Sequence, residues 1–266
     1  MATILITGAS DGLGRALAED LAQDGHHLLL HGRNTARLAE VAGITGGEVF
    51  SADLASLSAT RRLAADVTAR YDHLDVLVNN AGVGFRAGSA DREISADGHE
   101  LRLAVNYLAP VLLTQELLPL LRKATAARIV NVASVGQQLF DFDDPQHERG
   151  FSQADAYCRS KLALISHSVD LARRLEGTGI TVNAVHPATF MATTMTKDSG
   201  IPADEPLAKG VAATRRLVDD PGLAGVTGKY FHSFDQSTPS EPDALSPEYR
   251  HRLAAVTRDL LATAGV

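Results

Sequence analysis

The sequence predicts an α/β fold with a doubly wound parallel sheet of about seven strands and helices on both faces. Short apolar runs alternate with longer amphipathic stretches along the chain, and the runs are apolar throughout rather than at every second residue. Strands of this kind are typical of a parallel sheet covered on both sides. The first run also ends in a glycine-rich turn that opens a helical pattern, as in Rossmann-type folds.

The apolar runs place six strands, at Thr3–Thr7, His27–His31, Val49–Ala52, Val76–Asn79, Arg128–Ala133 and Ile180–Val185. Apolar residues at helical spacing predict helices over Gly12–Asp24, from Asn34 onward, and over 56–71, 96–122, 154–177 and about 247–262. The segments 136–153 and 233–246 break this alternation. Because the periodic pattern resumes after each of them, we expect residues 1–266 to form one domain.

Composition narrows the class of protein. The chain has 266 residues and a formal net charge of −7, which argues against a nucleic-acid-binding surface. Its single cysteine, Cys158, excludes an internal disulfide and favours a reducing compartment. No apolar run is expected to reach the ~18 residues of a membrane span. The N-terminus does not have the pattern of a signal peptide. A cytoplasmic protein without a membrane span, nucleic-acid partner or metal site is expected.

The turn after the first strand is a candidate phosphate-binding loop. Its glycine spacing is G-x-x-x-G-x-G, and the glycines allow a tight turn and a close backbone approach to a diphosphate at a helix N-terminus. The alternative is an ordinary strand–helix turn, but its position in the first βα unit favours the ligand. The expected cofactor contacts are Thr7, Gly8, Ser10, Asp11, Gly12, Leu13 and Gly14.

The end of the second strand indicates which cofactor binds. A carboxylate there would bind a ribose 2′-hydroxyl, whereas this chain has Arg33, with Arg15 in reach of the same region. A guanidinium binds phosphate oxygens bidentately, so NADP(H) is favoured over NAD(H), unless both arginines are only solvated surface charges. Asp53 and Leu54 follow the third strand and are expected near the adenine, although Asp53 also suits a simple turn.

Tyr157 and Lys161 form the candidate chemical centre. Positions i and i+4 share one helix face, so both side chains can reach one ligand. The ordinary pKa of a tyrosine, about 10, is too high for proton exchange near neutral pH. We expect the Lys161 ammonium to lower the pKa of Tyr157.

Ser134 follows the strand Arg128–Ala133, at the sheet edge where ligands of open α/β folds bind. Asn79–Gly82 ends the preceding strand at the same edge, and Asn106 lies in the long helical stretch between the two strands. With the glycine turn and the Tyr157–Lys161 pair, in this order, the sequence resembles the short-chain dehydrogenase/reductase family over residues 3–232.

The resemblance implies a role for each matching residue. Tyr157 would exchange a proton with the substrate oxygen, Lys161 would assist it and bind the nicotinamide ribose, and Ser134 would hydrogen-bond the carbonyl oxygen. Asn106 would hold a water in a proton relay, unless it is only a polar residue that shapes its helix. The remaining residues that would border the cofactor are Asn80, Ala81, Gly82, Pro187 and Thr189.

The second half of the chain resembles the retinol dehydrogenase-like branch of the family in Ala156–Ala163, Leu171–Leu175, Val185–Pro187 and Gly228–Phe231. One departure is Ala188, where the family usually has glycine after the proline, which puts the backbone contacts there in question. The family resemblance also implies a homodimer or homotetramer.

The loop 188–206 would cover the substrate. Apolar residues on it and nearby suggest a pocket for a lipophilic carbonyl or alcohol, although they also suit simple packing under their loops: Phe85, Leu139, Phe140, Phe142, Phe190, Met191, Met195 and Pro202. We interpret Cys158, which faces a different direction from Tyr157, as a packing residue rather than a nucleophile. Ser134 lacks the G-x-S-x-G context of a serine hydrolase.

Two functions are open from the sequence. The first is an NADP(H)-dependent reductase or dehydrogenase acting on a ketone, aldehyde or alcohol, with Tyr157 as general acid and base. The second is a non-catalytic dinucleotide-binding sensor or scaffold protein of the same fold. Retention of Ser134, Tyr157 and Lys161 favours the enzyme, because a scaffold has no chemical need for them.

Overall fold

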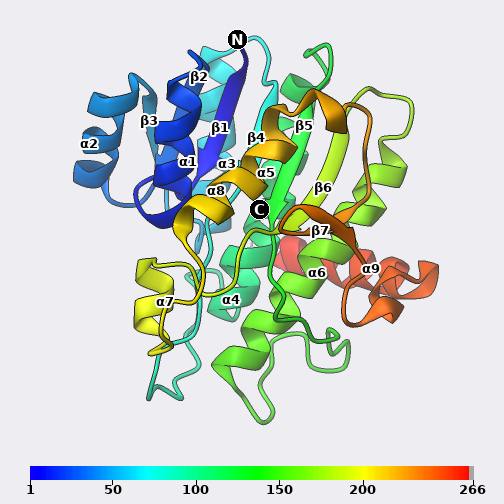
Figure 1. Ribbon diagram of the computed structural model, residues 1–266. Helices are drawn as coiled ribbons and strands as arrows, with labels where there is room; N and C mark the ends of the chain where they lie inside the picture. The colour runs from blue at the N-terminus through cyan, green and yellow to red at the C-terminus, as the bar shows by residue number, and fades with distance from the viewer. Residues whose placement is uncertain (264–266) are drawn as a thin grey trace.

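The computed structural model describes residues 1–263, which build one eight-stranded sheet in the order β3-β2-β1-β4-β5-β6-β7-β8 (Figure 1). The first seven strands are parallel, and β8 pairs antiparallel with β7. The strands are β1 (Thr3–Thr7), β2 (His27–Gly32), β3 (Glu48–Ser51), β4 (Val76–Asn79), β5 (Arg128–Val132), β6 (Thr181–His186), β7 (Tyr230–His232) and β8 (Asp235–Ser237). The predicted fold class is confirmed, with one additional, antiparallel strand at the edge.

Helices cover both faces of the sheet, as expected from strands without alternation. In β1, Ile4 and Ile6 pack on one face and Leu5 on the other. The first face is covered by α1 (Gly12–Ala22), α2 (Thr35–Thr45) and α8 (Leu207–Asp219). The second is covered by α3 (Leu57–Arg70), α5 (Ala109–Leu121) and α6 (Gln153–Arg174). Figure 1 shows α1 and α8 in front of the sheet, and α3 and α5 behind it.

The helical run Leu101–Leu121 is built from three parts: α4 (Leu101–Leu103), a π-helical turn at Ala104–Leu108, and α5. By length and composition it is apolar enough to cross a membrane, which corrects our reading that no run is long enough. However, 78% of its most apolar window is buried inside the protein. In this fold it is a core helix.

The C-terminal part of the chain returns to cover α6. After the 3₁₀ turns Pro221–Leu223 and Pro242–Leu245, α9 (Pro247–Thr263) packs on α6, and Figure 1 shows the two helices side by side. Tyr107 Oη and Thr257 Oγ1 share a buried hydrogen bond of 2.6 Å. The segment 136–150 has no regular structure, and its Phe140 amide donates to Tyr249 Oη (2.8 Å). α9 therefore joins this segment to the core.

We predict that truncating the apolar contact of α9 destabilises the whole fold. Leu253 is 2% exposed and packs in the cluster between α9, α6 and the long core helix. Leu253→Ala should lower the free energy of unfolding in urea by about 2–5 kcal/mol, because it removes buried apolar area and leaves a cavity. Ile44→Ala, at a side chain 61% exposed, is the control and should change it by less than about 0.5 kcal/mol. Equal effects of the two variants would contradict this packing.

Candidate functional site

Three glycines shape the turn between β1 and α1. Gly8 and Gly12 have φ values of 70° and 52°, in the left-handed region that favours glycine. A Cβ on Gly14 would lie 2.3 Å from the Gly8 carbonyl oxygen, so only glycine allows α1 to begin so close to the turn. Asp11 caps the helix, with its carboxylate accepting from the Gly12 amide at 2.8 Å. This close backbone approach fits the diphosphate of a dinucleotide.

The turn is fastened to the end of β4. Asn80 Nδ2 donates to the carbonyl oxygens of Thr7 (2.8 Å) and Gly8 (3.3 Å). Thr7 Oγ1 in turn accepts from the amides of Asn80 (2.9 Å) and Ala81 (3.0 Å). The side chain of Asn80 therefore fixes the turn to the end of β4, and the loop beginning at Ala81 continues along the same sheet edge.

Tyr157 and Lys161 lie one turn apart on α6, which Ser152 caps at its N-terminus. Lys161 is 3% exposed, and its Nζ donates to the Val132 carbonyl oxygen at 2.8 Å. Burial lowers the pKa of Lys161 to about 8. The Tyr157 ring meets Phe85 edge-on, with 6.0 Å between ring centroids.

The pKa of Tyr157 differs from our expectation. Burial raises it, while contact with the Ser134 side chain lowers it by less. Lys161 Nζ lies 5.8 Å from the centre of the tyrosine ring and is directed to the Val132 carbonyl. In this arrangement the pKa of Tyr157 stays raised, because burial outweighs the hydrogen bond with Ser134.

Ser134 is held at the end of β5 through its backbone. Its carbonyl oxygen accepts from Gln137 Nε2 (2.8 Å) and from Tyr230 Oη (3.2 Å), and its hydroxyl accepts from the Gly136 amide (3.1 Å). Tyr230 comes from β7, a strand that the apolar runs did not place. Sequence periodicity therefore could not show that the C-terminal part of the sheet supports Ser134.

Asn106 lies in the π-helical turn and holds the loop after β4. Its Oδ1 accepts from the Val83 amide (2.7 Å), and its Nδ2 donates to the Val83 carbonyl (3.0 Å) and Ser160 Oγ (3.1 Å). Pro110, four residues later, has no N–H to offer the Asn106 carbonyl, which a regular helix would provide. This proline was the sequence signal for the irregular turn, and we did not use it.

Residues from both halves of the chain thus meet at one edge of the sheet. A Cβ on Gly82 would lie 3.2 Å from Asn106 Oδ1 and 3.4 Å from Lys161 Nζ. Residues 2–202 match the family described as short chain dehydrogenase. The chain belongs to the short-chain dehydrogenase/reductase family. Members of this family are NAD(P)-dependent oxidoreductases that interconvert carbonyls and alcohols, and this chain is such an enzyme.

Individual relatives refine this placement. The chain is 34% identical to retinol dehydrogenase 13 of Homo sapiens, over 97% of this chain and 84% of the relative. It is 40% identical to retinol dehydrogenase 11 of Mus musculus, over 70% and 60%. The structure of the RhlG/NADP complex of Pseudomonas aeruginosa superposes with a TM-score of 0.71 at 29% identity, covering 87% of this chain and 94% of that one. The chain is a retinol dehydrogenase-like short-chain dehydrogenase/reductase.

The arginines near the second strand of this dehydrogenase differ in their partners. Arg15 pairs with Glu19 (2.8 Å) and Glu40 (3.8 Å). Arg37, which we did not single out, lies 3.4 Å from the Asp11 carboxylate. Arg33 is exposed and has no ion pair or hydrogen bond among residues 1–263. Arg33 is therefore the arginine free to bind a phosphate.

The residues after β3 have structural roles of their own. The Asp53 carboxylate accepts from the Ala55 amide (3.0 Å), the turn geometry that we kept as its alternative role. Leu54 is buried in the core under α3 and α5. Their contacts with an adenine stay predictions.

The loop 188–206 crosses from β6 to the glycine turn. The Thr189 amide donates to Glu205 Oε2 (2.5 Å), and Thr194 Oγ1, in α7 (Thr194–Asp198), donates to Asp11 Oδ2 (2.6 Å). Pro187 and Ala188 are buried, and Ala188 is outside the left-handed region, so the backbone here does not need the glycine usual in the family. The loop thus lies against the proposed phosphate site.

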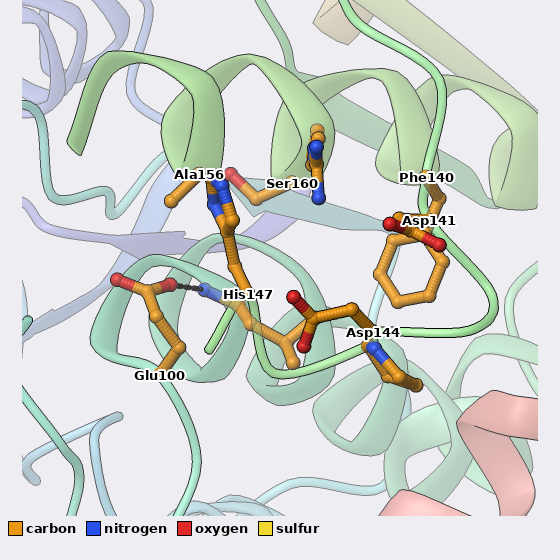
Figure 2. A pocket seen from close by; sticks show the side chains of 10 residues that line it. Glu100, Phe140, Asp141, Asp144, His147, Ala156 and Ser160 are labelled. Carbon is orange, nitrogen blue, oxygen red and sulfur yellow. Dashed lines mark hydrogen bonds between the residues drawn. The ribbon is translucent and has the colours of Figure 1, made fainter. Parts of the chain in front are cut away.

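Two residues expected at the substrate pocket lie elsewhere. Phe140 is buried and contacts Phe142, which packs against Tyr249 and under the Arg252 guanidinium. Both rings therefore lie beneath α9 and pack in the same apolar cluster as its Tyr249 and Leu253. Beside them, a small cavity lies between α6 and the 140–147 segment, and its lining includes Asp144, His147 and Ser160 (Figure 2). Tyr157 and Lys161 do not line it.

One cluster of possible metal ligands occurs in the described part of the chain. Atoms of Asp24, His26 and Asp219 lie within 4.8 Å of one another. Arg215 donates to both aspartates and also to Asp20 (2.8 Å). The cluster is therefore an ion-pair network that joins α8 to α1 rather than a cation site.

Burial of Lys161 predicts a measurable pH dependence. Its pKa in the folded chain, about 8, lies below the unfolded value of 10.5, so the unfolded chain binds more protons between these values and stability rises with pH there. In urea unfolding, the stability of wild type relative to Lys161→Met should increase by about 1.4 kcal/mol per pH unit between pH 8 and 10.

Lys123→Met, at an exposed lysine, is the matched control, and its difference from wild type should stay constant. A constant difference for Lys161→Met as well would show that Lys161 is not buried as a charged group.

Proposed function

We propose that this enzyme uses NADP(H) to interconvert a lipophilic carbonyl compound and its alcohol, with Tyr157 as general acid and base. The observation that carries the proposal is the meeting of Ser134, Tyr157 and Lys161 beside a glycine turn shaped for a diphosphate. A Cβ on Gly136 would lie within 4 Å of both Ser134 Oγ and the Tyr157 ring. A Cβ on Gly82 would lie within 4 Å of Lys161 Nζ. Ser134 and Tyr157 thus border one of these positions, and Lys161, one helical turn from Tyr157, borders the other.

The proposed roles follow from this placement. When bound, the nicotinamide supplies the hydride in reduction and accepts it in oxidation. Tyr157 gives its phenolic proton to the substrate oxygen in reduction and takes it back in oxidation. The Ser134 hydroxyl donates a hydrogen bond to the same oxygen as negative charge develops on it. The Lys161 ammonium would bind the nicotinamide ribose, and Asn106 fixes the loop at Val83 beside it.

Arg33 is the proposed determinant of NADP(H) over NAD(H). It follows β2, at the edge where the ribose of the adenosine would lie, and it has no partner among the described residues. Arg15 and Arg37 are both engaged by carboxylates, which would leave them weaker ligands for a 2′-phosphate.

Exposed apolar side chains around the site support a lipophilic substrate. Large apolar side chains are more than one third exposed on the two segments that border it, at Val135, Leu139, Phe190 and Met195. Clusters of this kind on a soluble surface commonly mark a binding site. The cytoplasmic location and the homodimeric or homotetrameric assembly expected from the sequence also stay proposals.

Tyr157→Phe tests the chemistry. The variant lacks the proton that the mechanism transfers, so the rate of NADPH oxidation with an active carbonyl should fall by about 10²–10⁴-fold. The Kd for NADPH, measured by fluorescence titration, should stay within a few fold. Tyr71→Phe, at a tyrosine paired with His27 away from the site, should keep full activity.

Unchanged activity of Tyr157→Phe would overturn the mechanism. NADPH binding by wild type without turnover of any carbonyl would instead favour the non-catalytic sensor or scaffold.

Arg33→Ala tests cofactor choice. Loss of one charge-assisted contact with the 2′-phosphate should raise the Kd for NADPH by roughly 10–100-fold, because such contacts contribute about 1.5–3 kcal/mol. The Kd for NADH should change little, and Arg122→Ala, at an exposed arginine after α5, is the control. Tighter binding of NADH than NADPH by wild type would contradict this assignment.

A further inference from the structure

Gly136 lies two residues after Ser134. Glycine is favoured at this position by the lack of room for a side chain, not by the backbone conformation. Its φ lies outside the left-handed region, so the backbone accepts an alanine there without strain. Its amide donates to Ser134 Oγ at 3.1 Å, which keeps it beside the hydroxyl proposed to bind the substrate oxygen.

A methyl group on Gly136 would enter the space next to the reacting groups. Its carbon would lie 3.1 Å from Cys158 Sγ, 3.6 Å from Ser134 Oγ and 3.8 Å from Tyr157 Cε1. A carbonyl oxygen that hydrogen-bonds both hydroxyls lies about 2.7–2.8 Å from each of them. A substituent of that carbonyl on the Gly136 side would lie where this methyl group would be.

Cys158 forms the far wall of this space. Cys158 follows Tyr157 on α6, and its thiol lies against Gly136, where a Cβ would also be near Ser134 and Tyr157. Burial raises the pKa of the thiol, so it is a neutral, weakly polar wall. The 3.1 Å approach leaves little room between the sulfur and an added methyl group.

We propose that Gly136 and Cys158 together set the largest substituent that the substrate carbonyl can place on this side of Ser134 and Tyr157. The other substituent of the carbonyl extends toward the exposed apolar side chains of Val135 and Leu139. This inference rests on the proposed function, since it assigns the two residues to the same reacting space.

A series of carbonyls with one constant nonyl chain tests the proposal. The second substituent is hydrogen, methyl, ethyl or propyl, and kcat/KM is measured by NADPH oxidation. Gly136→Ala should lower the activity with the ethyl ketone relative to the aldehyde by about 10-fold or more, since one methylene in a fitted pocket changes rates by roughly 10–200-fold. Cys158→Ala should raise this ratio by a similar factor.

The double variant separates pocket size from damage to the fold. Removing the sulfur frees the space that the new methyl group needs, so Gly136→Ala with Cys158→Ala should return the ratio to near that of wild type. Gly43→Ala, where an added Cβ meets nothing within 4 Å, should leave the whole series unchanged. Thermal unfolding and the Kd for NADPH should be close to wild type in every variant.

Three results would overturn the proposal. An equal loss across the series in Gly136→Ala would mean a purely structural role. An unchanged ratio in both single variants would mean that substrate does not pass this point. If wild type turns over no member of the series while binding NADPH, the proposed function fails and this inference fails with it.

Discussion

Thr7 and Asn80 join the ends of β1 and β4 through hydrogen bonds that the rest of the site depends on. Neighbouring parallel strands bring their carboxyl ends to one edge, but sheet pairing alone does not fix the loops that leave them. Here the side-chain amide of Asn80 fixes the glycine turn by donating to the carbonyl oxygens of Thr7 and Gly8. The same loop then reaches Val83, which Asn106 holds from the π-helical turn between α4 and α5.

Burial decides the electrostatics at this edge. Lys161 is almost fully enclosed, donates to a strand carbonyl and has a pKa lowered to about 8, so its charge is costly without further partners. Burial also raises the pKa of Tyr157. An anionic phosphate-bearing ligand and a developing negative charge on the substrate are both compatible with this surplus of buried positive charge, although the chain as a whole is acidic.

The sequence predicted best where one physical signal dominates. β1 and β4 have the expected bounds, because Gly8 and Asn80 directly follow their apolar runs and mark where each strand ends. The pairing of Tyr157 with Lys161 follows from helix geometry alone. β8 could not be placed, because Asp235–Ser237 is short, polar and exposed, and only its pairing with β7 makes it a strand.

Errors concentrate where side chains have several possible partners. Phe140 and Phe142 lie in a segment without periodicity, so nothing local indicated that α9 would cover them. Glu19 lies four residues after Arg15 on the same helix, so this ion pair was predictable from helix spacing, whereas only the fold brings Glu40 to Arg15. Cys158 follows Tyr157 on its helix, and its approach to Gly136 depends on where the chain turns after β5.

We propose that this edge of the sheet transfers a hydride between NADP(H) and a carbonyl carbon. The most direct measurement uses NADPH deuterated at C4 of the nicotinamide and an apolar aldehyde, with mass spectrometry and NMR of the products. Direct hydride transfer predicts an alcohol with one deuterium on its carbinol carbon when the transferred position carries the label, and unlabelled alcohol when the opposite C4 position carries it. Consumption of NADPH with deuterium lost to water, or alcohol unlabelled with either form, would contradict it.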